Sequence, residues 1–233
     1  MAGSKKILVV FTSHTKMIDN DHPTGYYLPE IAHPAYAFER AGYTLDAVSP
    51  KGGEAPLDQA SVDAFKDDKE CQAFLKSDKW QAWVKNTGKL SDVPADGKGY
   101  DAIFYPGGHG PCFDLPVDEH SKALIKAFYE SGRPTTAVCH APAVFTDVKL
   151  SDGSYLLKGK KATCFTDAEE EQAQLTKAIP WLVESRMVER GCDFSKTKPW
   201  GEHVVVDGNL LTGQNPASAG PLAEKIIEVL SKA

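Results

Sequence analysis

The sequence lacks any apolar run long enough to span a membrane. Two lysines, Lys5 and Lys6, precede the apolar segment 7–11. Such a short segment cannot serve as the apolar region of a secretory signal peptide, which needs 7–15 residues. The segment is therefore predicted to be a β-strand. We expect a cytoplasmic protein with no membrane partner.

The sequence also lacks an excess of positive charge. It has 26 Lys and Arg against 32 Asp and Glu, which gives a net charge of −6. No block rich in Lys or Arg stands out. Binding to nucleic acid or to anionic lipid depends on such blocks. We therefore expect no nucleic-acid partner.

Paired cysteines are missing as well. The cysteines are odd in number, none lies in a Cys-x-x-Cys motif, and they occupy positions 71, 112, 139, 164 and 192. This pattern argues against a disulfide framework or a zinc site and favours a reducing compartment. His14, His22 and His33 show no recognisable ligand spacing, so no metal site is predicted. No Gly-x-Gly-x-x-Gly follows the first strand and no phosphate loop is present, so no cofactor is predicted.

What the sequence does contain is an alternation of apolar, strand-length segments with helical patterns. The hydrophobic fraction is 42% over 233 residues, which suits one domain, residues 1–233, with a sizeable core. The alternation indicates an α/β fold whose mostly parallel sheet is sandwiched by helices. Strands are predicted at 5–13, 42–50, 100–108, 134–140 and 160–167, a hairpin at 203–213, and helices at 28–42, 118–132, 168–191 and 216–233.

One region interrupts this alternation. Residues 51–99 are highly charged and include Trp80 and Trp83. We predict a mainly helical insertion, or lid, rather than a separate domain. Pro180 is predicted to kink or break the helix over 168–191.

The stretch TTAVCHAPAV places a cysteine and a histidine together where the fourth strand should end. In open α/β sheets, reactive groups gather beyond the carboxyl ends of strands. Pro142 is typical of a first helical turn. Cys139 should therefore lie on a tight strand-to-helix turn, where a helix N-terminus lowers a thiol pKa. The alternative is a buried structural cysteine. Cys164, in the middle of a predicted strand, fits that role, and Cys112 is a weaker rival nucleophile.

Two further segments are candidates for the same edge of the sheet. The motif YPGGHG (105–110) follows the third strand. The backbone N–H groups of Gly108 and His140 are predicted to face a developing oxyanion, unless the motif is an ordinary glycine-rich turn. Glu30 follows Pro29 at a helix start, where a carboxylate is stabilised by the helix dipole. The functional alternative is a proton carrier beside the thiol, whose charge would raise the pKa of Glu30.

Taken in this order, these segments resemble the ThiJ/PfpI superfamily, also called class I glutamine amidotransferase-like. Within it the chain is similar to the glutathione-independent glyoxalase branch, which also contains small stress-inducible chaperones. The resemblance implies a flavodoxin-like fold. The segments that carry it are TGYYLPEIAHP, YPGGHG, AVCHAPA, FTDAEEE, IPWLVE and VVVDGNLLTGQNPASA.

The resemblance also implies roles for individual residues. Cys139 matches the nucleophile and His140 the catalytic histidine. Glu170 matches the acid that orients this histidine, although the neighbouring Glu169 and Glu171 leave the assignment open by one position. Glu30 matches the acid beside the thiol, and Gly108 the oxyanion donor.

The activity that the resemblance implies is D-lactate dehydratase, the glyoxalase III type of lyase, in which the enzyme itself supplies the thiol. Its substrate would be a small 2-oxoaldehyde, methylglyoxal first, and it would use no cofactor. A homodimer is expected. Three other functions stay open: a holdase chaperone, a protein deglycase that uses the same cysteine, and an oxidation sensor.

Overall fold

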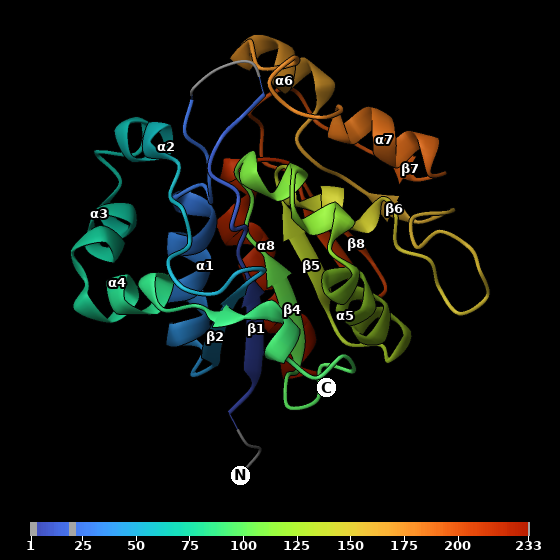
Figure 1. Ribbon diagram of the computed structural model, residues 1–233, viewed down its shortest axis with the longest axis horizontal. Coiled ribbons are helices and arrows are strands. Elements are labelled where there is room, and N and C mark those ends of the chain that lie inside the picture. Colours follow the sequence, from blue (N-terminus) through green and yellow to red (C-terminus); the bar gives the residue numbers. More distant parts are fainter. Residues whose placement is uncertain (1–3, 19–21, 233) are drawn as a thin grey trace.

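The computed structural model describes residues 4–18 and 22–232. Their strands form a seven-stranded, mostly parallel sheet in the order β3-β2-β1-β4-β5-β9-β8, in which only β8 runs antiparallel, against β9 (Figure 1). The predicted α/β fold and its mostly parallel sheet are confirmed. The strands are β1 (Lys6–Val10), β2 (Thr44–Ser49), β3 (Gly88–Lys89), β4 (Ala102–Tyr105), β5 (Thr135–Val138), β8 (Val204–Asp207) and β9 (Leu210–Gly213).

Helices cover both faces of the sheet, which explains the nearly continuous apolar sequence of its central strands. Ile7 and Val9 of β1 belong to one core cluster, together with α1 and α8. Leu8 and Val10 belong to the other, together with α5. The helices are α1 (Pro29–Arg40), α2 (Gln59–Ala64), α3 (Lys69–Lys76), α4 (Asp78–Lys85), α5 (Glu119–Glu130), α6 (Asp167–Ala173), α7 (Val183–Glu189) and α8 (Ala219–Ser231).

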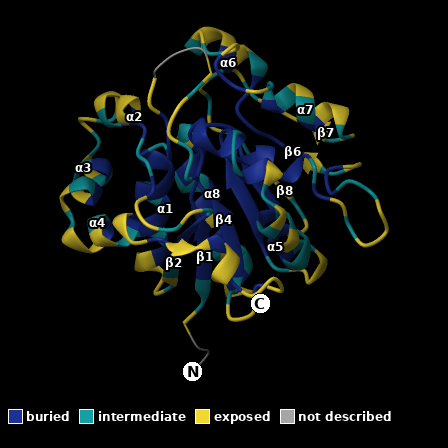
Figure 2. Cartoon of the chain, viewed as in Figure 1, coloured by how far each residue is buried: buried dark blue, intermediate teal, exposed yellow. Residues whose placement is uncertain are grey.

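The sheet is the buried centre of the molecule, and exposed residues gather on the outer sides of the helices (Figure 2). Each predicted strand from 5 to 140 is present but shorter than expected. The hairpin turns at Gly208, whose φ of +61° suits glycine. Among the described residues, no helix is long and apolar enough to cross a membrane.

The region 51–99 is mainly helical, as predicted, and it also supplies a strand. Helices α2, α3 and α4 lie together beside α1 (Figure 1). The chain then returns to the sheet, where β3 pairs with the edge of β2 through Val48 and Gly88. Its role as a lid stays a prediction.

In the second half of the chain, one predicted strand is wrong and the predicted helix is broken in two. Of the strand predicted at 160–167, only β6 (Lys161–Ala162) forms, and it pairs with β7 (Asp193–Phe194) outside the main sheet. The chain leaves extended pairing because it crosses the end of β5, where the N–H of Phe165 donates to the carbonyl of Cys139 at 2.8 Å. Cys164 therefore lies in no strand, although it is fully buried.

The helix predicted over 168–191 is split into α6 and α7. The predicted break is present and includes Pro180, but it begins earlier, because α6 already ends at Ala173 and Gln174 adopts the left-handed conformation with φ of +60°. The short α6 is thereby free to lie across the carboxyl edge of the sheet (Figure 1). That position brings Glu170 to the residues that follow β5.

Candidate active site

Cys139 lies directly after β5 in an unusual backbone conformation. Its φ of +61° belongs to the left-handed region, which costs an L-residue roughly 1–2 kcal/mol. Two backbone hydrogen bonds hold it there, one from its own N–H to the carbonyl of Gly213 and one to its carbonyl from Phe165. The predicted tight turn is present. The chain around it stores strain at the residue that carries the thiol, a pattern typical of functional sites.

The segment after Cys139 differs from the prediction. It is a short 3₁₀-helix, Ala141–Phe145, with Pro142 in its first turn, and not an α-helix. Five residues of 3₁₀-helix supply only a small axial dipole. The helix N-terminus is therefore not a strong source of stabilisation for a thiolate at this position.

His140 links the sulfur to a carboxylate. Its Nδ1 lies 3.2 Å from Sγ of Cys139, and its Nε2 lies 2.5 Å from Oε2 of Glu170. When Nε2 carries the proton and donates it to Glu170, Nδ1 is left as an acceptor facing the thiol. A thiol, an imidazole and a carboxylate thus lie within hydrogen-bond reach, in the order that nucleophilic catalysis requires. His140 is 1% exposed.

The structure separates the three consecutive glutamates. Glu170 faces His140, whereas Glu171 is exposed. Glu169 is buried and caps α6 together with Thr166. It also accepts hydrogen bonds at 2.8 Å from the N–H of Trp200 and from Nδ2 of Asn215. Glu169 therefore holds neighbouring loops, and Glu170 alone of the three reaches the histidine.

A second histidine shares this carboxylate. Nε2 of His109 donates to Oε1 of Glu170 at 2.9 Å, and the rings of His109 and His140 lie 4.0 Å apart. Burial and the nearby His140 lower the pKa of His109, although Glu170 opposes them. The sequence interpretation missed His109 because it assigned YPGGHG to backbone turns. A histidine between two glycines at a strand end was the available signal.

Glu30 lies in the first turn of α1 and is completely buried. Neither carboxylate oxygen makes a hydrogen bond of good geometry, although the Cys139 thiol and the N–H of Gly107 approach it. Burial raises the pKa of Glu30 to about 8, and these two neighbours only partly offset it. A Cβ on Gly107 would lie 2.3 Å from Oε2 of Glu30, so only glycine fits beside this carboxylate.

The expected low thiol pKa is not what the surroundings produce. Burial raises the pKa of the Cys139 thiol, and the Glu30 carboxylate raises it further, whereas the N–H of Gly108 lowers it. The two acids occupy one buried site and titrate as a pair. A thiolate at Cys139 therefore requires the proton to stay on Glu30, so the pair exchanges one proton internally.

Gly108 presents its N–H to the sulfur through a conformation that glycine favours. Its φ is +96°, and a Cβ there would lie 2.2 Å from the carbonyl oxygen of Gly25. This N–H is the donor that lowers the pKa of Cys139. The structure thus brings Gly108 to the predicted place. The N–H of His140 as a second oxyanion donor stays a prediction.

The sulfur opens onto a cavity of about 440 Å³. Its wall is mainly apolar and includes aromatic rings, with Trp200 stacked edge-on against Phe165 at 5.4 Å. Asp58, the N-cap of α2, supplies a buried carboxylate to this wall, so the 51–99 region takes part in the site. The lining residues are Met17, His22, Pro23, Tyr27, Asp58, Ala60, Gly108, His109, Cys139, His140, Phe165, Ala173, Gln174, Leu175, Trp200 and Pro216.

The rival thiols lack this setting. Cys112 and Cys164 are buried and neither lines the cavity. Burial raises the pKa of both, and neither has a histidine within hydrogen-bond reach among the described residues. Cys164 is buried, as a structural cysteine should be. Cys112 does not face the cavity that a substrate would enter.

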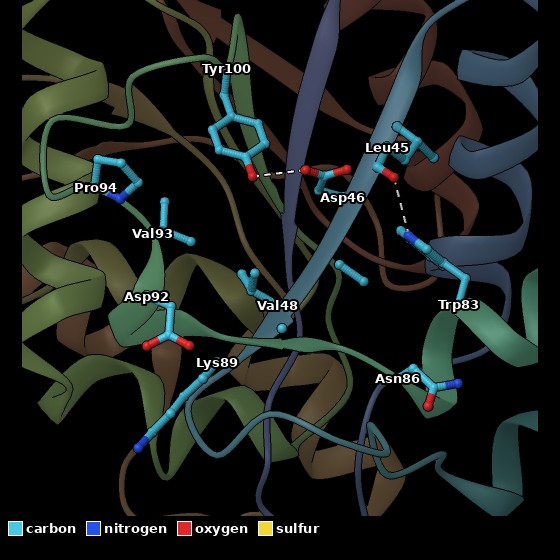
Figure 3. A pocket seen from close by; sticks show the side chains of 12 residues that line it. Leu45, Asp46, Val48, Trp83, Asn86, Lys89, Asp92, Val93, Pro94 and Tyr100 are labelled. Atoms are coloured by element: carbon cyan, nitrogen blue, oxygen red, sulfur yellow. Dashed lines mark hydrogen bonds between the residues drawn. The ribbon is translucent and has the colours of Figure 1, made fainter.

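Another hollow, of about 400 Å³, lies beside the outer edge of β2 (Figure 3). There Tyr100 donates to Asp46 at 2.9 Å, and Trp83 donates to the carbonyl of Leu45 at 3.2 Å. Its lining includes no cysteine or histidine. The cavity at Cys139, by contrast, is lined by both residue types.

Fold and site together define the class of protein. Residues 24–229 match the model of the DJ-1/PfpI family, and the chain belongs to this family. The resemblance inferred from the motifs is confirmed, including its glutathione-independent glyoxalase branch.

Several known proteins of this family are similar to the chain over nearly its full length. Glyoxalase 3 of Candida albicans is 31% identical over 95% of this chain and 97% of its own length. Glutathione-independent glyoxalase HSP31 of Saccharomyces cerevisiae is 30% identical over 97% of this chain and 98% of its own. The crystal structure of the 24 kDa rapid encystment protein of Francisella tularensis is 34% identical. It covers 97% of this chain and 99% of its own, with a TM-score of 0.91.

Proposed function

We propose that this protein is a glutathione-independent glyoxalase. It would convert methylglyoxal and related 2-oxoaldehydes to 2-hydroxy acids by the D-lactate dehydratase reaction run in the direction of water addition. The observation that carries the proposal is a strained, cavity-facing thiol held between two proton carriers, His140 at 3.2 Å and the buried Glu30. The similarity to glutathione-independent glyoxalases of two yeasts supports it.

The first step forms a bond between sulfur and the aldehyde carbon. The proton of the Cys139–Glu30 pair ends on the former carbonyl oxygen, which gives a hemithioacetal and leaves Glu30 ionised. The N–H of Gly108, which already faces the sulfur, donates to this oxygen as negative charge develops. No outside thiol is consumed.

The second step moves a proton between neighbouring carbons. A base removes the proton from the carbon bonded to sulfur, and the electron pair forms an enediolate. Glu30 and His140 flank the sulfur and are the two candidate bases. A carboxylate whose pKa is about 8 is a much stronger base than an ordinary one. An imidazolium at His140 would be balanced by Glu170.

The last step releases the product. Return of the proton to the adjacent carbon gives a 2-hydroxyacyl thioester on Cys139. Water then adds to the thioester carbonyl, and sulfur leaves as the thiol. The balance is one aldehyde plus one water to one hydroxy acid, with no oxidant or reductant.

A direct test incubates the protein with methylglyoxal in the absence of glutathione, followed by chiral analysis of lactate. D-lactate formed catalytically supports the proposal. No lactate from a folded protein would contradict it. The same assay on Cys139→Ser establishes whether any lactate depends on the proposed nucleophile.

The other functions predicted from the sequence have less support. A protein deglycase would use the same thiol and cavity, and its test is release of amines from glycated peptides. A holdase needs an exposed apolar patch. The large apolar side chains that are exposed among the described residues come from separate segments: Ile18, Val117, Val188, Trp200 and Val206.

A further inference from the structure

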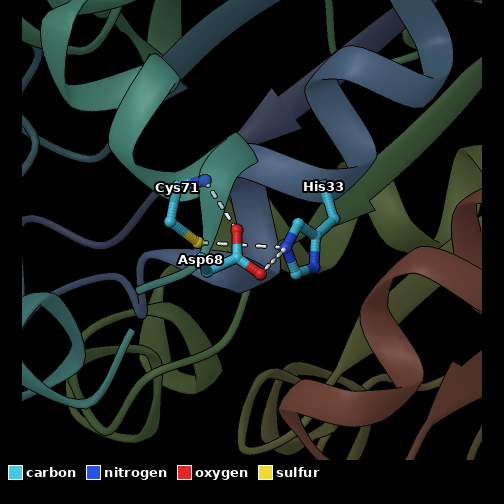
Figure 4. Close-up of side chains that lie close together, drawn as sticks. All are labelled: His33, Asp68 and Cys71. Carbon is cyan, nitrogen blue, oxygen red and sulfur yellow. Dashed lines mark hydrogen bonds and ion pairs between the residues drawn. The ribbon is translucent and has the colours of Figure 1, made fainter. Parts of the chain in front are cut away.

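A second group of a cysteine, a histidine and a carboxylate lies where the 51–99 region packs against α1 (Figure 4). His33 comes from α1, Asp68 is the N-cap of α3, and Cys71 lies in the first turn of α3. One donor atom from each lies within 4.8 Å of the other two. Only two groups with this property occur in the described part of the chain, and the other is His109, His140 and Glu170 at the candidate active site.

The distances suit a small metal ion. Nε2 of His33 lies 3.1 Å from Oδ2 of Asp68 and 3.9 Å from Sγ of Cys71. Zinc binds nitrogen, oxygen and sulfur at about 2.0–2.3 Å, so tetrahedral ligands lie about 3.3–3.7 Å apart. The two observed separations bracket that range. The third pair, the Asp68 oxygen and the Cys71 sulfur, lies within 4.8 Å, so small side-chain movements would bring all three atoms to one ion.

Two of the three ligands are fixed relative to each other before any ion binds. The other carboxylate oxygen of Asp68 accepts the N–H of Cys71 at 2.8 Å, which fixes both residues at the start of α3. The sulfur is fully buried, whereas the side chains of His33 and Asp68 are 24% and 30% exposed. An ion could therefore enter from solvent and meet the sulfur on its inner side.

We propose that His33, Asp68 and Cys71 bind a divalent ion of the zinc class, with water as the fourth ligand. A set of one sulfur, one nitrogen and one oxygen favours zinc over calcium or magnesium, which prefer oxygen alone. The ion replaces the proton shared between His33 and Asp68, and binding releases the thiol proton of Cys71. Sequence spacing could not reveal this site, because His33 and Asp68 are 35 positions apart.

Such an ion ties α3 to α1. His33 lies three residues after Glu30 on α1, so the metal fastens the insertion to the helix that carries the buried acid of the active site. None of its three protein ligands lines the cavity at Cys139. Its expected effect is therefore on stability rather than on the chemical step.

The test uses Co²⁺ with the full-length protein in a Cys139→Ala background, which removes the active-site thiol. The proposal predicts one equivalent of Co²⁺ with thiolate charge-transfer absorption and tetrahedral visible bands. Both must disappear in Cys71→Ser and His33→Gln and persist in the control Cys192→Ser. Absorption that survives Cys71→Ser, or its absence from the parent, overturns the proposal.

A second measurement guards against variants that fail to fold. Asp68→Asn keeps the helix cap, because Asn caps as well as Asp, but it removes the charged ligand. Zinc titrated by calorimetry should bind Asp68→Asn about tenfold or more weakly, and zinc should raise the melting temperature of the parent more than that of the variant. Equal affinity and equal thermal shifts would contradict the site.

Discussion

The molecule contains two sets of a cysteine, a histidine and a carboxylate, and they differ in what surrounds them. In the first set, Sγ of Cys139 lies 3.2 Å from Nδ1 of His140, and Nε2 of His140 lies 2.5 Å from Oε2 of Glu170. In the second set, around Cys71, one nitrogen of His33 faces both partners, with sulfur at 3.9 Å and oxygen at 3.1 Å. The first set is therefore linear, whereas in the second set both partners face the same histidine nitrogen.

The convergent set around Cys71 suits binding of a metal ion, and the linear set around Cys139 suits proton transfer. In the linear set each nitrogen of His140 has its own partner, so a proton can pass from sulfur towards the carboxylate. Only Cys139 also has a left-handed backbone, a cavity and a second acid, Glu30. Residue types alone therefore do not identify a nucleophile. Connectivity, cavity and strain separate the two sets.

The largest expected effect comes from removing one sulfur at a time. Cys139→Ser should lower lactate formation by about 10⁴-fold or more, the scale seen when a nucleophile is lost, and the protein should stay folded. Cys71→Ser should keep substantial turnover, because Cys71 does not line the cavity. Steady-state assays with circular dichroism as a folding control measure both. Equal losses of turnover in the two variants would contradict the distinction between the two cysteine sets.

The second acid offers the next largest effect. Glu30→Gln should lower turnover by about 10²–10⁴, the usual contribution of general acid–base catalysis. Glu39→Gln, on the exposed part of the same helix, is the matched control and should retain activity. The assay is lactate formation at saturating methylglyoxal. Unchanged turnover in Glu30→Gln would reduce Glu30 to a helix-start carboxylate.

The three glutamates of α6 should separate activity from stability. Glu170→Ala should reduce turnover, but less than Glu30→Gln, because His140 keeps part of its position. Glu169→Ala should mainly lower the melting temperature, since Glu169 anchors Trp200 and Asn215. Glu171→Ala should change neither quantity. If Glu171 rather than Glu170 controlled turnover, the observed relay would not be the catalytic one.

The last effect concerns stability and not turnover: it is a pH dependence of unfolding. Burial raises the pKa of Glu30 from 4.5 to about 8, so in that window the unfolded chain is ionised there and the folded protein is protonated. The contribution to the free energy of unfolding is full below pH 4.5. It falls as pH rises towards 8, by at most roughly 1.4 kcal/mol per unit.

Urea unfolding between pH 5 and 8 measures this slope. Glu30→Gln should flatten the curve relative to wild type, and Glu39→Gln should not. The comparison of slopes removes the contributions of other titrating groups. A slope unchanged in Glu30→Gln would mean that its carboxyl titrates normally despite burial.

The sequence could predict the features that depend on local pattern. The apolar segments located β1, β2, β4 and β5, and the rule that sites lie at carboxyl ends of strands brought Cys139, Gly108 and Glu30 to one edge. Features that depend on distant contacts were missed. His109 matters because Glu170 lies against it, and residues 163–165 form no strand because they cross the end of β5.

The predicted thiol pKa was wrong for the same reason. A proline after a strand indicates a helix start, but the pattern does not show that the helix is a short 3₁₀ turn. Nor does it show that Glu30 is completely buried against the sulfur. Both facts depend on tertiary packing.

The most direct test of the account follows activity and thiol modification together. Iodoacetamide is added in limiting amounts, and each cysteine peptide is mapped as lactate formation declines. The account predicts that activity falls in proportion to alkylation of Cys139, and that methylglyoxal slows both. It also predicts that alkylation of the more exposed Cys192 leaves activity intact. Activity that falls in step with Cys71 or Cys112, or full activity with Cys139 alkylated, would contradict it.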